Sequence, residues 1–188
     1  MKKNKNQTLR IIIIVILLLA IFISIGVVAF VNRYYPVRHV EIIYKHADEF
    51  EVDRSLVFAV INAESRFRER AQSAAGARGL MQIMEGTANW IAPMAGLNDF
   101  DYEQIFDPDI NIRLGVYYLS MLMRWYGSAE VALCAYNAGP GNVDKWLENP
   151  EYSSDGKTLD FIPFAETRAY VSRVMDYQRM YELILRFR

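Results

Sequence analysis

Glu64 is the residue whose position most needs a chemical explanation. In a helix it falls four residues after Val60 and three after Ile61, so it shares the apolar face that packs on a core. Burial raises the pKa of a carboxyl group, which would let Glu64 hold a proton near neutral pH and donate it to a leaving oxygen. Periodicity alone favours the other interpretation, a structural carboxylate that pairs with Arg66 or Arg68 or reaches solvent at the helix end.

Two later segments could form the walls of a binding site around such an acid. Residues 73–82, with the sequence SAAGARGLMQ, offer backbone that can approach a ligand closely and an amide side chain at Gln82. Tyr136 and Asn137 come just before Gly139, so a phenol and an amide lie where a glycine turn can leave them facing a cleft. Each segment alone also has a structural interpretation, because glycine-rich loops and helix caps are usually structural.

The helices that must position these residues are predicted from apolar residues that recur at spacings of three and four. One helix covers residues 40–50, and Asp53 caps a second that carries Glu64 and ends near Ser65. Further helices are predicted from Thr87 to Pro93, Asp107 to Trp125, Ser128 to Tyr136, Asn142 to Leu147 and Thr167 to Leu185. Residues 159–162 are the one candidate extended piece, so the expected fold is mostly α.

The uncharged apolar run at residues 11–31 is typical of a transmembrane helix. At ~1.5 Å per residue it would cover ~30 Å, the thickness of the hydrocarbon core of a bilayer. A cleaved signal peptide is the alternative, but its apolar region is usually only about 7–15 residues long. Only Val27-Val28-Ala29 faintly resembles a cleavage site. We therefore expect an uncleaved anchor.

The distribution of charge predicts where the rest of the chain lies. Residues 1–10 carry four cations and no acid, and such flanks stay on the cytoplasmic side of a membrane. The expected organisation is a basic cytoplasmic flank at residues 1–10, a transmembrane anchor at 11–31, a linker at 32–37 and one folded domain outside the cytoplasm at 38–188.

Charge also bears on partners and cofactors. Residues 32–188 carry 17 Lys and Arg against 22 Asp and Glu, which argues against nucleic acid and leaves a largely neutral sugar polymer open. Asp99, Asp101 and Glu103 alternate as at the start of a calcium-binding loop. Gln104 and Ile110, however, stand where that loop needs a glycine and a bidentate acid. No metal or other cofactor is predicted.

Four groups of residues occur in an order that identifies a family. They are Ala63-Glu64-Ser65, then Gly79-Leu80-Met81-Gln82-Ile83-Met84 with Gly86-Thr87-Ala88, then Ala135-Tyr136-Asn137-Ala138-Gly139-Pro140-Gly141-Asn142-Val143, and finally Ile162-Pro163-Phe164 with Glu166-Thr167-Arg168-Ala169-Tyr170-Val171. Together they span about residues 40–185 and resemble the signatures of the soluble-lytic-transglycosylase (SLT-type, family 1) catalytic domain, of the lysozyme-like superfamily. Phe106-Asp107-Pro108 and Asn111-Ile112-Arg113-Leu114-Gly115 add to the resemblance.

The resemblance implies a lysozyme-like, goose-type helical fold with a groove for alternating N-acetylglucosamine and N-acetylmuramic acid. It implies that Glu64 is the catalytic acid/base. Met81 is expected to pack in the core, and Ser65 either supports the helix end or contacts substrate. The positions that the resemblance assigns to the binding groove and its support are Ser73, Gln82, Met84, Tyr136, Asn137, Glu166 and Tyr170.

The resemblance also implies a mechanism with one carboxylate, whereas ordinary glycosidases use two. The candidates for a second acid, none of them within a matched motif, are Glu85, Asp99, Asp101 and Glu103. The expected function is that of a membrane-anchored lytic transglycosylase, which cleaves peptidoglycan strands outside the cell membrane and leaves 1,6-anhydro ends. The alternatives are a hydrolytic muramidase, a noncatalytic glycan-binding module and a wall-opening component of an envelope-spanning machine. No particular protein partner is indicated.

Overall fold

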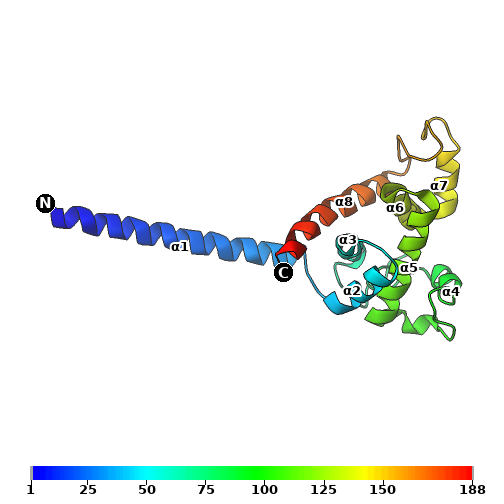
Figure 1. The fold of residues 1–188 in the computed structure, drawn as a ribbon, viewed down its shortest axis with the longest axis horizontal. Coiled ribbons are helices and arrows are strands. Elements are labelled where there is room, and N and C mark those ends of the chain that lie inside the picture. The colour runs from blue at the N-terminus through cyan, green and yellow to red at the C-terminus, as the bar shows by residue number, and fades with distance from the viewer. Residues whose placement is uncertain (1, 188) are drawn as a thin grey trace. The chain divides into compact units, whose positions relative to one another are not determined.

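A computed structural model describes residues 2–187 of the chain, with side chains from Gln7 onward. It divides into two compact units at Pro36 (Figure 1). The first is one helix, α1 (Lys2–Tyr34). The second begins at Val37 and holds α2 (Val40–Glu49), α3 (Arg54–Ser65), α4 (Glu85–Ile91), the 3-10 helix η1 (Tyr102–Phe106), α5 (Pro108–Tyr126), α6 (Ala129–Ala138), α7 (Pro140–Leu147) and α8 (Ala165–Arg186).

Helix α1 contains the predicted apolar run and extends beyond both of its ends. From Gln7 to Tyr34 its most apolar window has a mean hydropathy of 3.5, and its side chains are exposed. Its length and composition make it a candidate membrane span, because an exposed apolar surface of this extent is unfavourable in water.

The predicted mostly α fold of the second unit is confirmed. Between residues 37 and 187 the extended pairing is limited to two isolated bridges, Gln72 with Arg78 and Arg78 with Ile83. The predicted extended piece at residues 159–162 is wrong. The backbone N–H groups of residues 160 and 161 both donate to the Tyr152 carbonyl, so this segment closes a local turn instead of pairing as a strand.

Three predicted helix starts are confirmed, and each has a polar side chain at the cap. The Asp53 carboxylate accepts hydrogen bonds from two backbone N–H groups in the first turn of α3. Asp107 does the same for α5, where Pro108 occupies the first helical position. Ser128 caps α6. These side chains satisfy N–H groups that a helix leaves unpaired at its start.

Helices α7 and α8 begin two residues earlier than predicted, and the cap of α4 lies three residues before the predicted cap, Thr87. Thr87 lies inside α4, whose cap residue Met84 makes no side-chain cap bond; Glu85 in the first turn favours this end through its charge. Pro140 starts α7, because a proline at the first position loses no hydrogen bond. The cap of α8 is the apolar Phe164. A search for polar caps misses such starts.

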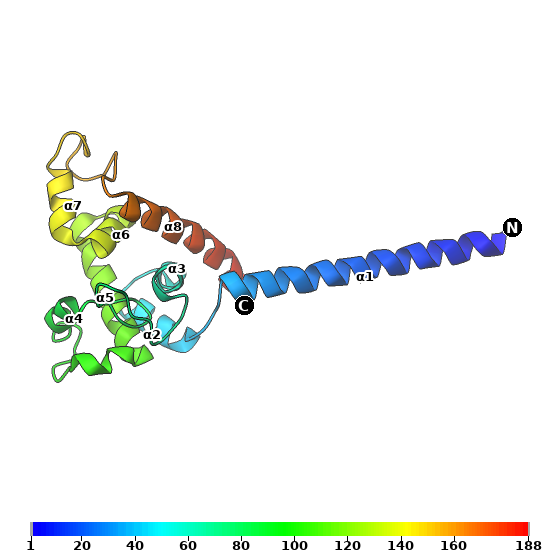
Figure 2. The ribbon, with the colours of Figure 1, turned by 180° about the vertical axis from the view of Figure 1, so that it is seen from behind.

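Helix α3 is the buried centre of the domain. Figures 1 and 2 show α8 beside it, and α3 contacts both α8 and α2, while α2 also contacts α5. Residues 55–62 of α3 are all buried, which removes a large apolar area from water. Helix α5 packs on α6, and α6 in turn contacts α7 and α8. Glu64, near the end of α3, therefore follows directly on a buried segment of the core.

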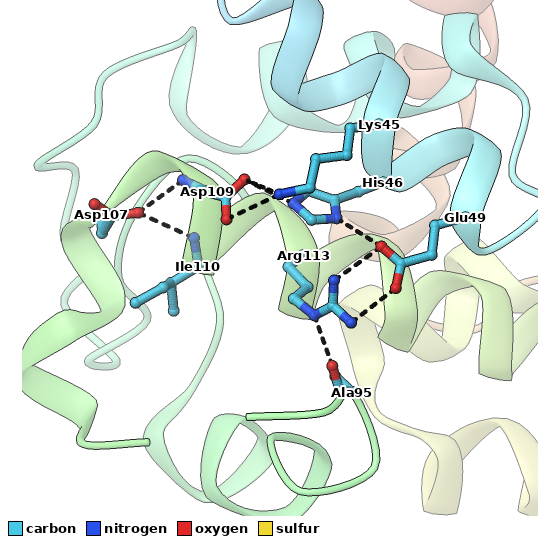
Figure 3. A network of polar contacts seen from close by, with 8 residues as sticks. All are labelled: Lys45, His46, Glu49, Ala95, Asp107, Asp109, Ile110 and Arg113. Carbon is cyan, nitrogen blue, oxygen red and sulfur yellow. Dashed lines mark hydrogen bonds and ion pairs between the residues drawn. The ribbon is translucent and has the colours of Figure 1, made fainter. Parts of the chain in front are cut away.

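A polar network joins α2 to α5 (Figure 3). The two ring nitrogens of the fully buried His46 lie 3.3 Å from Glu49 Oε2 and 3.0 Å from Asp109 Oδ1. Arg113 donates two hydrogen bonds of 2.8 Å to the Glu49 carboxylate and a third, through Nε, to the Ala95 carbonyl. The Arg113 hydrogen bonds hold the pKa of Glu49 below its usual range. The network sets the position of α5 against α2.

Met81 packs directly against Gly115 of α5, and its side chain is fully buried, as predicted for a core residue. A Cβ atom added at Gly115 would lie 2.7 Å from Met81 Cβ. Such an overlap cannot be relieved by rotating a side-chain end, so the glycine is required for this close approach of loop and helix.

Replacing Gly115 with Ala should destabilise the domain by about 1–3 kcal/mol, the usual cost of overpacking, despite the better helix propensity of alanine. Thermal unfolding of the full chain in detergent micelles, followed by circular dichroism, measures this change. The control is Gly141→Ala in α7, where an added Cβ meets no atom within 4 Å. A Gly115→Ala protein as stable as the wild type would show that Met81 can move aside.

Candidate active site

Glu64 lies at the second-last position of α3. The helix ends at Ser65, and Arg66 follows in the left-handed conformation with φ 53°. Ser65 is buried, and its Oγ donates to the Ile61 carbonyl over 3.1 Å. The structure therefore gives Ser65 a role in closing the helix, while Glu64 projects from the last turn.

Burial raises the pKa of Glu64 to about 7, and Tyr170 and Arg173 partly oppose the rise by stabilising the ionised form. At neutral pH the carboxyl group is therefore divided between its protonated and ionised forms. A group in this state can donate a proton in one step and accept one in the next, which is the requirement for general acid and base catalysis.

The alternative interpretation of Glu64 as half of an ion pair with Arg66 or Arg68 is not what the structure shows. Among residues 2–187, neither arginine forms a salt bridge with Glu64. The Arg68 Nε donates to the Ser65 carbonyl over 3.0 Å, and Arg66 is exposed. The acid is left without the partner that would keep it permanently ionised.

Two tyrosines lie beside Glu64, and both were predicted. The Tyr136 hydroxyl donates to the Met81 carbonyl over 2.8 Å. The Tyr170 hydroxyl is buried close to the Glu64 carboxyl, where hydrogen bonding from the phenol stabilises the ionised form, and it has no other partner within the described chain. Burial, followed by the nearby charge of Glu64, raises the pKa of both phenols well above the usual value. Both therefore remain protonated at physiological pH.

Asn111 of α5 holds the loop that carries Met81. Its Oδ1 accepts from the Met81 N–H over 2.7 Å, and its Nδ2 donates to the carbonyls of Arg78 and Ile105 over 3.1 and 2.9 Å. The loop comes this close because Gly79 has φ +82° and no Cβ, which would otherwise lie 2.9 Å from the Ile105 oxygen.

Gln82 and Ser73, predicted to bind substrate, are engaged inside the same loop. The Gln82 Nε2 donates to the carbonyls of Ala71 and Gly79 over 3.1 and 2.8 Å. Its two amide hydrogens are thereby committed, and a ligand would meet Gln82 through its oxygen. The Ser73 Oγ accepts from the backbone N–H four residues later over 3.0 Å. Met84, by contrast, is 44% exposed at the start of α4.

Asn137 and Glu166 meet at a cleft of about 560 Å³. The end of α6 and the first turn of α8 form its walls, together with the segment that begins at Pro163. Glu166 is exposed and does not contribute to the pKa of Glu64. The structure thus groups Glu166 with Asn137, whereas Tyr170, one helical turn further along α8, reaches Glu64.

The four candidates for a second carboxylate lie on exposed surface. Asp101 caps η1, and Glu103 forms an ion pair of 3.2 Å with Arg78. Glu85 stands in the first turn of α4, and Asp99 lies in the loop before η1. None of the four contributes to the pKa of Glu64. The described centre therefore has one acid.

Arg173 is a residue of the site that sequence reasoning missed. It is exposed on α8, one turn after Tyr170, and its guanidinium lies 5.9 Å from the centre of the Tyr170 ring. Its charge lowers the pKa of Glu64 and of Tyr170. The available signal was its spacing of three from Tyr170, which places both on one helix face, but an exposed arginine on a helix usually belongs to a solvated surface.

The chain is similar in sequence to bacterial lytic murein transglycosylases. The chain is 33% identical over 154 residues to the soluble lytic murein transglycosylase of Escherichia coli K12, which covers 80% of this chain and 24% of that protein. It is 28% identical over 176 residues to the membrane-bound lytic murein transglycosylase C of Edwardsiella ictaluri, covering 78% of this chain and 47% of that protein. The chain thus spans only a quarter to a half of these relatives.

A solved structure shows the same fold. It is an inactive glutamate-to-glutamine mutant of the lytic transglycosylase Slt from Pseudomonas aeruginosa, with a TM-score of 0.73 and 34% identity over 83% of this chain and 26% of that one. This likeness confirms the predicted lysozyme-like helical fold. The family model for the transglycosylase SLT domain matches residues 41–158, from α2 through the centre around Glu64 to the segment after α7. The chain belongs to the transglycosylase SLT domain family.

Proposed function

We propose that this chain is a membrane-anchored peptidoglycan lytic transglycosylase. It would cleave the β-1,4 bond from N-acetylmuramic acid to N-acetylglucosamine without consuming water and leave a 1,6-anhydro end. The observation that carries the proposal is the half-buried Glu64, whose pKa is raised to about 7 and to which no other carboxylate of residues 2–187 contributes. The names of the relatives, which are lytic murein transglycosylases, support the substrate and the reaction.

In the first step the protonated Glu64 donates its proton to the glycosidic oxygen as the bond from that oxygen to C1 of the muramic acid breaks. The N-acetyl carbonyl of the same sugar stabilises the positive charge that develops at C1. This substrate assistance replaces the nucleophile or base that a second carboxylate supplies in ordinary glycosidases.

In the second step the ionised Glu64 takes the proton from the 6-hydroxyl of the muramic acid, and O6 attacks C1 to close the anhydro ring. The hydroxyl belongs to the same sugar, so its effective concentration is high and water need not compete. The proton returns to Glu64, and the centre is ready for another cycle. Tyr170 and Arg173 favour the ionised form that this step requires.

The residues proposed to contact the substrate are those that the family resemblance assigns to the groove. Tyr136 and Asn137 would lie near the N-acetyl group, and Ser73, Gln82 and Met84 would line the groove. Glu166 would contact the strand, or the peptides it carries, at the cleft that it shares with Asn137.

Helix α1 would hold the domain at the cell membrane. It is apolar and exposed from Gln7 to Tyr34, and the four cations of residues 1–10 precede the predicted span. By the positive-inside tendency the N-terminus would be cytoplasmic, with a single pass and the domain outside. A membrane-bound relative supports the anchoring.

Purified peptidoglycan treated with the full chain in detergent micelles should release fragments with 1,6-anhydro-muramic acid ends, detected by mass spectrometry. Glu64→Gln should release none, because the amide keeps the shape but has no proton to exchange. Glu103→Gln, which changes an exposed acid, is the matched control and should behave as the wild type. Reducing muramic acid ends from the wild type would instead establish a hydrolase.

The pH dependence of kcat/KM should show activity falling as the pH rises above about 7, because Glu64 must begin the reaction protonated. Arg173→Gln should move this limb to higher pH, since the arginine charge lowers the pKa of Glu64. Arg179→Gln, on the same helix and paired with Asp176, is the control. If the fall in kcat/KM occurred at the same pH in Arg173→Gln as in the wild type, it would not report the titration of Glu64.

Glu64→Gln should also stabilise the domain at high pH. The folded-state pKa of Glu64 is raised from 4.5 to about 7, so its contribution to stability is fully present below pH 4.5 and is lost as the pH rises through 7. Above pH 7 the glutamine variant should therefore be more stable, by on the order of 3 kcal/mol. Unfolding midpoints of both proteins at pH 4 and pH 8 test this, and an equal difference at both values would contradict a raised pKa.

A further inference from the structure

Four aromatic side chains form a continuous row from the catalytic centre to the protein surface. Tyr136, beside Glu64, lies 5.4 Å from Tyr118 between ring centres. Tyr118 meets Trp90 edge to face at 6.4 Å, and Trp90 lies 6.1 Å from Trp125 with the two rings inclined at 43°. The row joins the end of α6 to α5 and α4.

The two tryptophans at the outer end of this row are exposed. Trp90 is 48% and Trp125 is 55% exposed, whereas the third tryptophan of the chain, Trp146, is 6% exposed and belongs to the core. Exposing two large adjoining rings to water forgoes the free energy that their burial would supply. Adjoining exposed rings of this kind are typical of a binding surface.

Both tryptophans lie on helices that pack against other elements of the domain. Trp125 is in the last turn of α5, where the neighbouring Tyr126 donates a hydrogen bond of 2.7 Å to Asp144 of α7. Trp90 is near the end of α4, which packs on α5 and begins just after the exposed Met84. Since both helices are already packed in the domain, binding at this surface would cost little backbone entropy.

We propose that Trp90 and Trp125 form a sugar-stacking platform, which binds pyranose rings of the glycan strand away from the bond that is cleaved. The apolar C–H faces of a pyranose suit the electron-rich faces of indole rings, and this contact needs no charge on the ligand. The proposal rests on the proposed function, because its occupant is the same strand whose bond lies at Glu64.

The short separation between the platform and the catalytic centre is the reason for choosing the strand as occupant. Trp90 is two ring contacts from Tyr136, and exposed apolar side chains stand at Met84, just before α4, and at Trp90 within it. A polymer held at the catalytic centre extends beyond the cleaved bond and can reach the platform without a second binding event. Such additional contacts favour long strands over short fragments through high effective concentration.

The double variant Trp90→Ala/Trp125→Ala tests the platform. KM and kcat for release of anhydro ends would be measured with long peptide-free glycan strands and with the shortest fragment that the wild-type chain cleaves. For long strands KM should rise roughly tenfold, the size of effect expected for the loss of buried aromatic contacts at a binding surface. For the short fragment KM should not change, and kcat should be similar for both substrates.

The short fragment separates failure of the platform from failure of the proposed function. If the wild-type chain releases no anhydro ends from either substrate, the proposed function fails. If the double variant cleaves both substrates with wild-type KM, or loses activity on both equally, the platform is overturned and the catalytic proposal stands. Phe187→Ala, which removes an 88% exposed ring at the end of α8, is the control and should leave KM unchanged.

Binding can also be followed without cleavage. In the Glu64→Gln background, long strands should change the intrinsic tryptophan fluorescence, and the change should disappear in Trp90→Ala/Trp125→Ala, which retains Trp146. Trp90→Phe/Trp125→Phe should recover most of the affinity, because a smaller ring still offers a stacking face. Full binding of long strands by the double alanine variant would overturn the proposal.

Discussion

The position of one peptide unit, at Met81, is the constraint on which the catalytic centre depends. Its N–H donates to Asn111 of α5, and its carbonyl accepts from Tyr136 of α6. Two helices and the motif loop are thereby joined at a single point. Glu64 can remain half-buried without an ion pair because its neighbours are held in place by this framework and not by the charge of the acid itself.

The position of the Met81 peptide unit also explains why glycines stand in the loop and on the helix that faces it. Gly79 and Gly115 remove the two Cβ atoms that would keep the loop away from Asn111 and Met81 away from α5. Helix α5 is positioned in turn by the Glu49 and Arg113 hydrogen bonds to α2. The glycine contacts and the hydrogen bonds to α2 therefore both help to position Tyr136 and Glu64.

Local chemistry made part of this structure predictable from sequence. Asp53, Asp107 and Ser128 marked helix starts because a side-chain cap is a local event, and the apolar spacing around Glu64 placed it correctly on the core side of α3. The starts of α4, α7 and α8 were missed because their caps use no side-chain bond. The two hydrogen bonds of the Gln82 amide and the effect of Arg173 depend on segments brought together only by folding, so no spacing rule could supply them.

Tyr136 and Tyr170 are both motif tyrosines, yet their hydroxyl groups donate their hydrogens to different partners. The hydrogen of Tyr136 is donated to the Met81 carbonyl, whereas that of Tyr170 is directed to Glu64, and the Tyr170 hydroxyl has no other partner within the described chain. Only one phenolic proton is therefore free to follow the charge of Glu64 as it appears and disappears during a cycle. Tyr136 therefore holds the Met81 loop in place, whereas the Tyr170 hydroxyl can reorient with the charge of Glu64. The two tyrosines are not interchangeable.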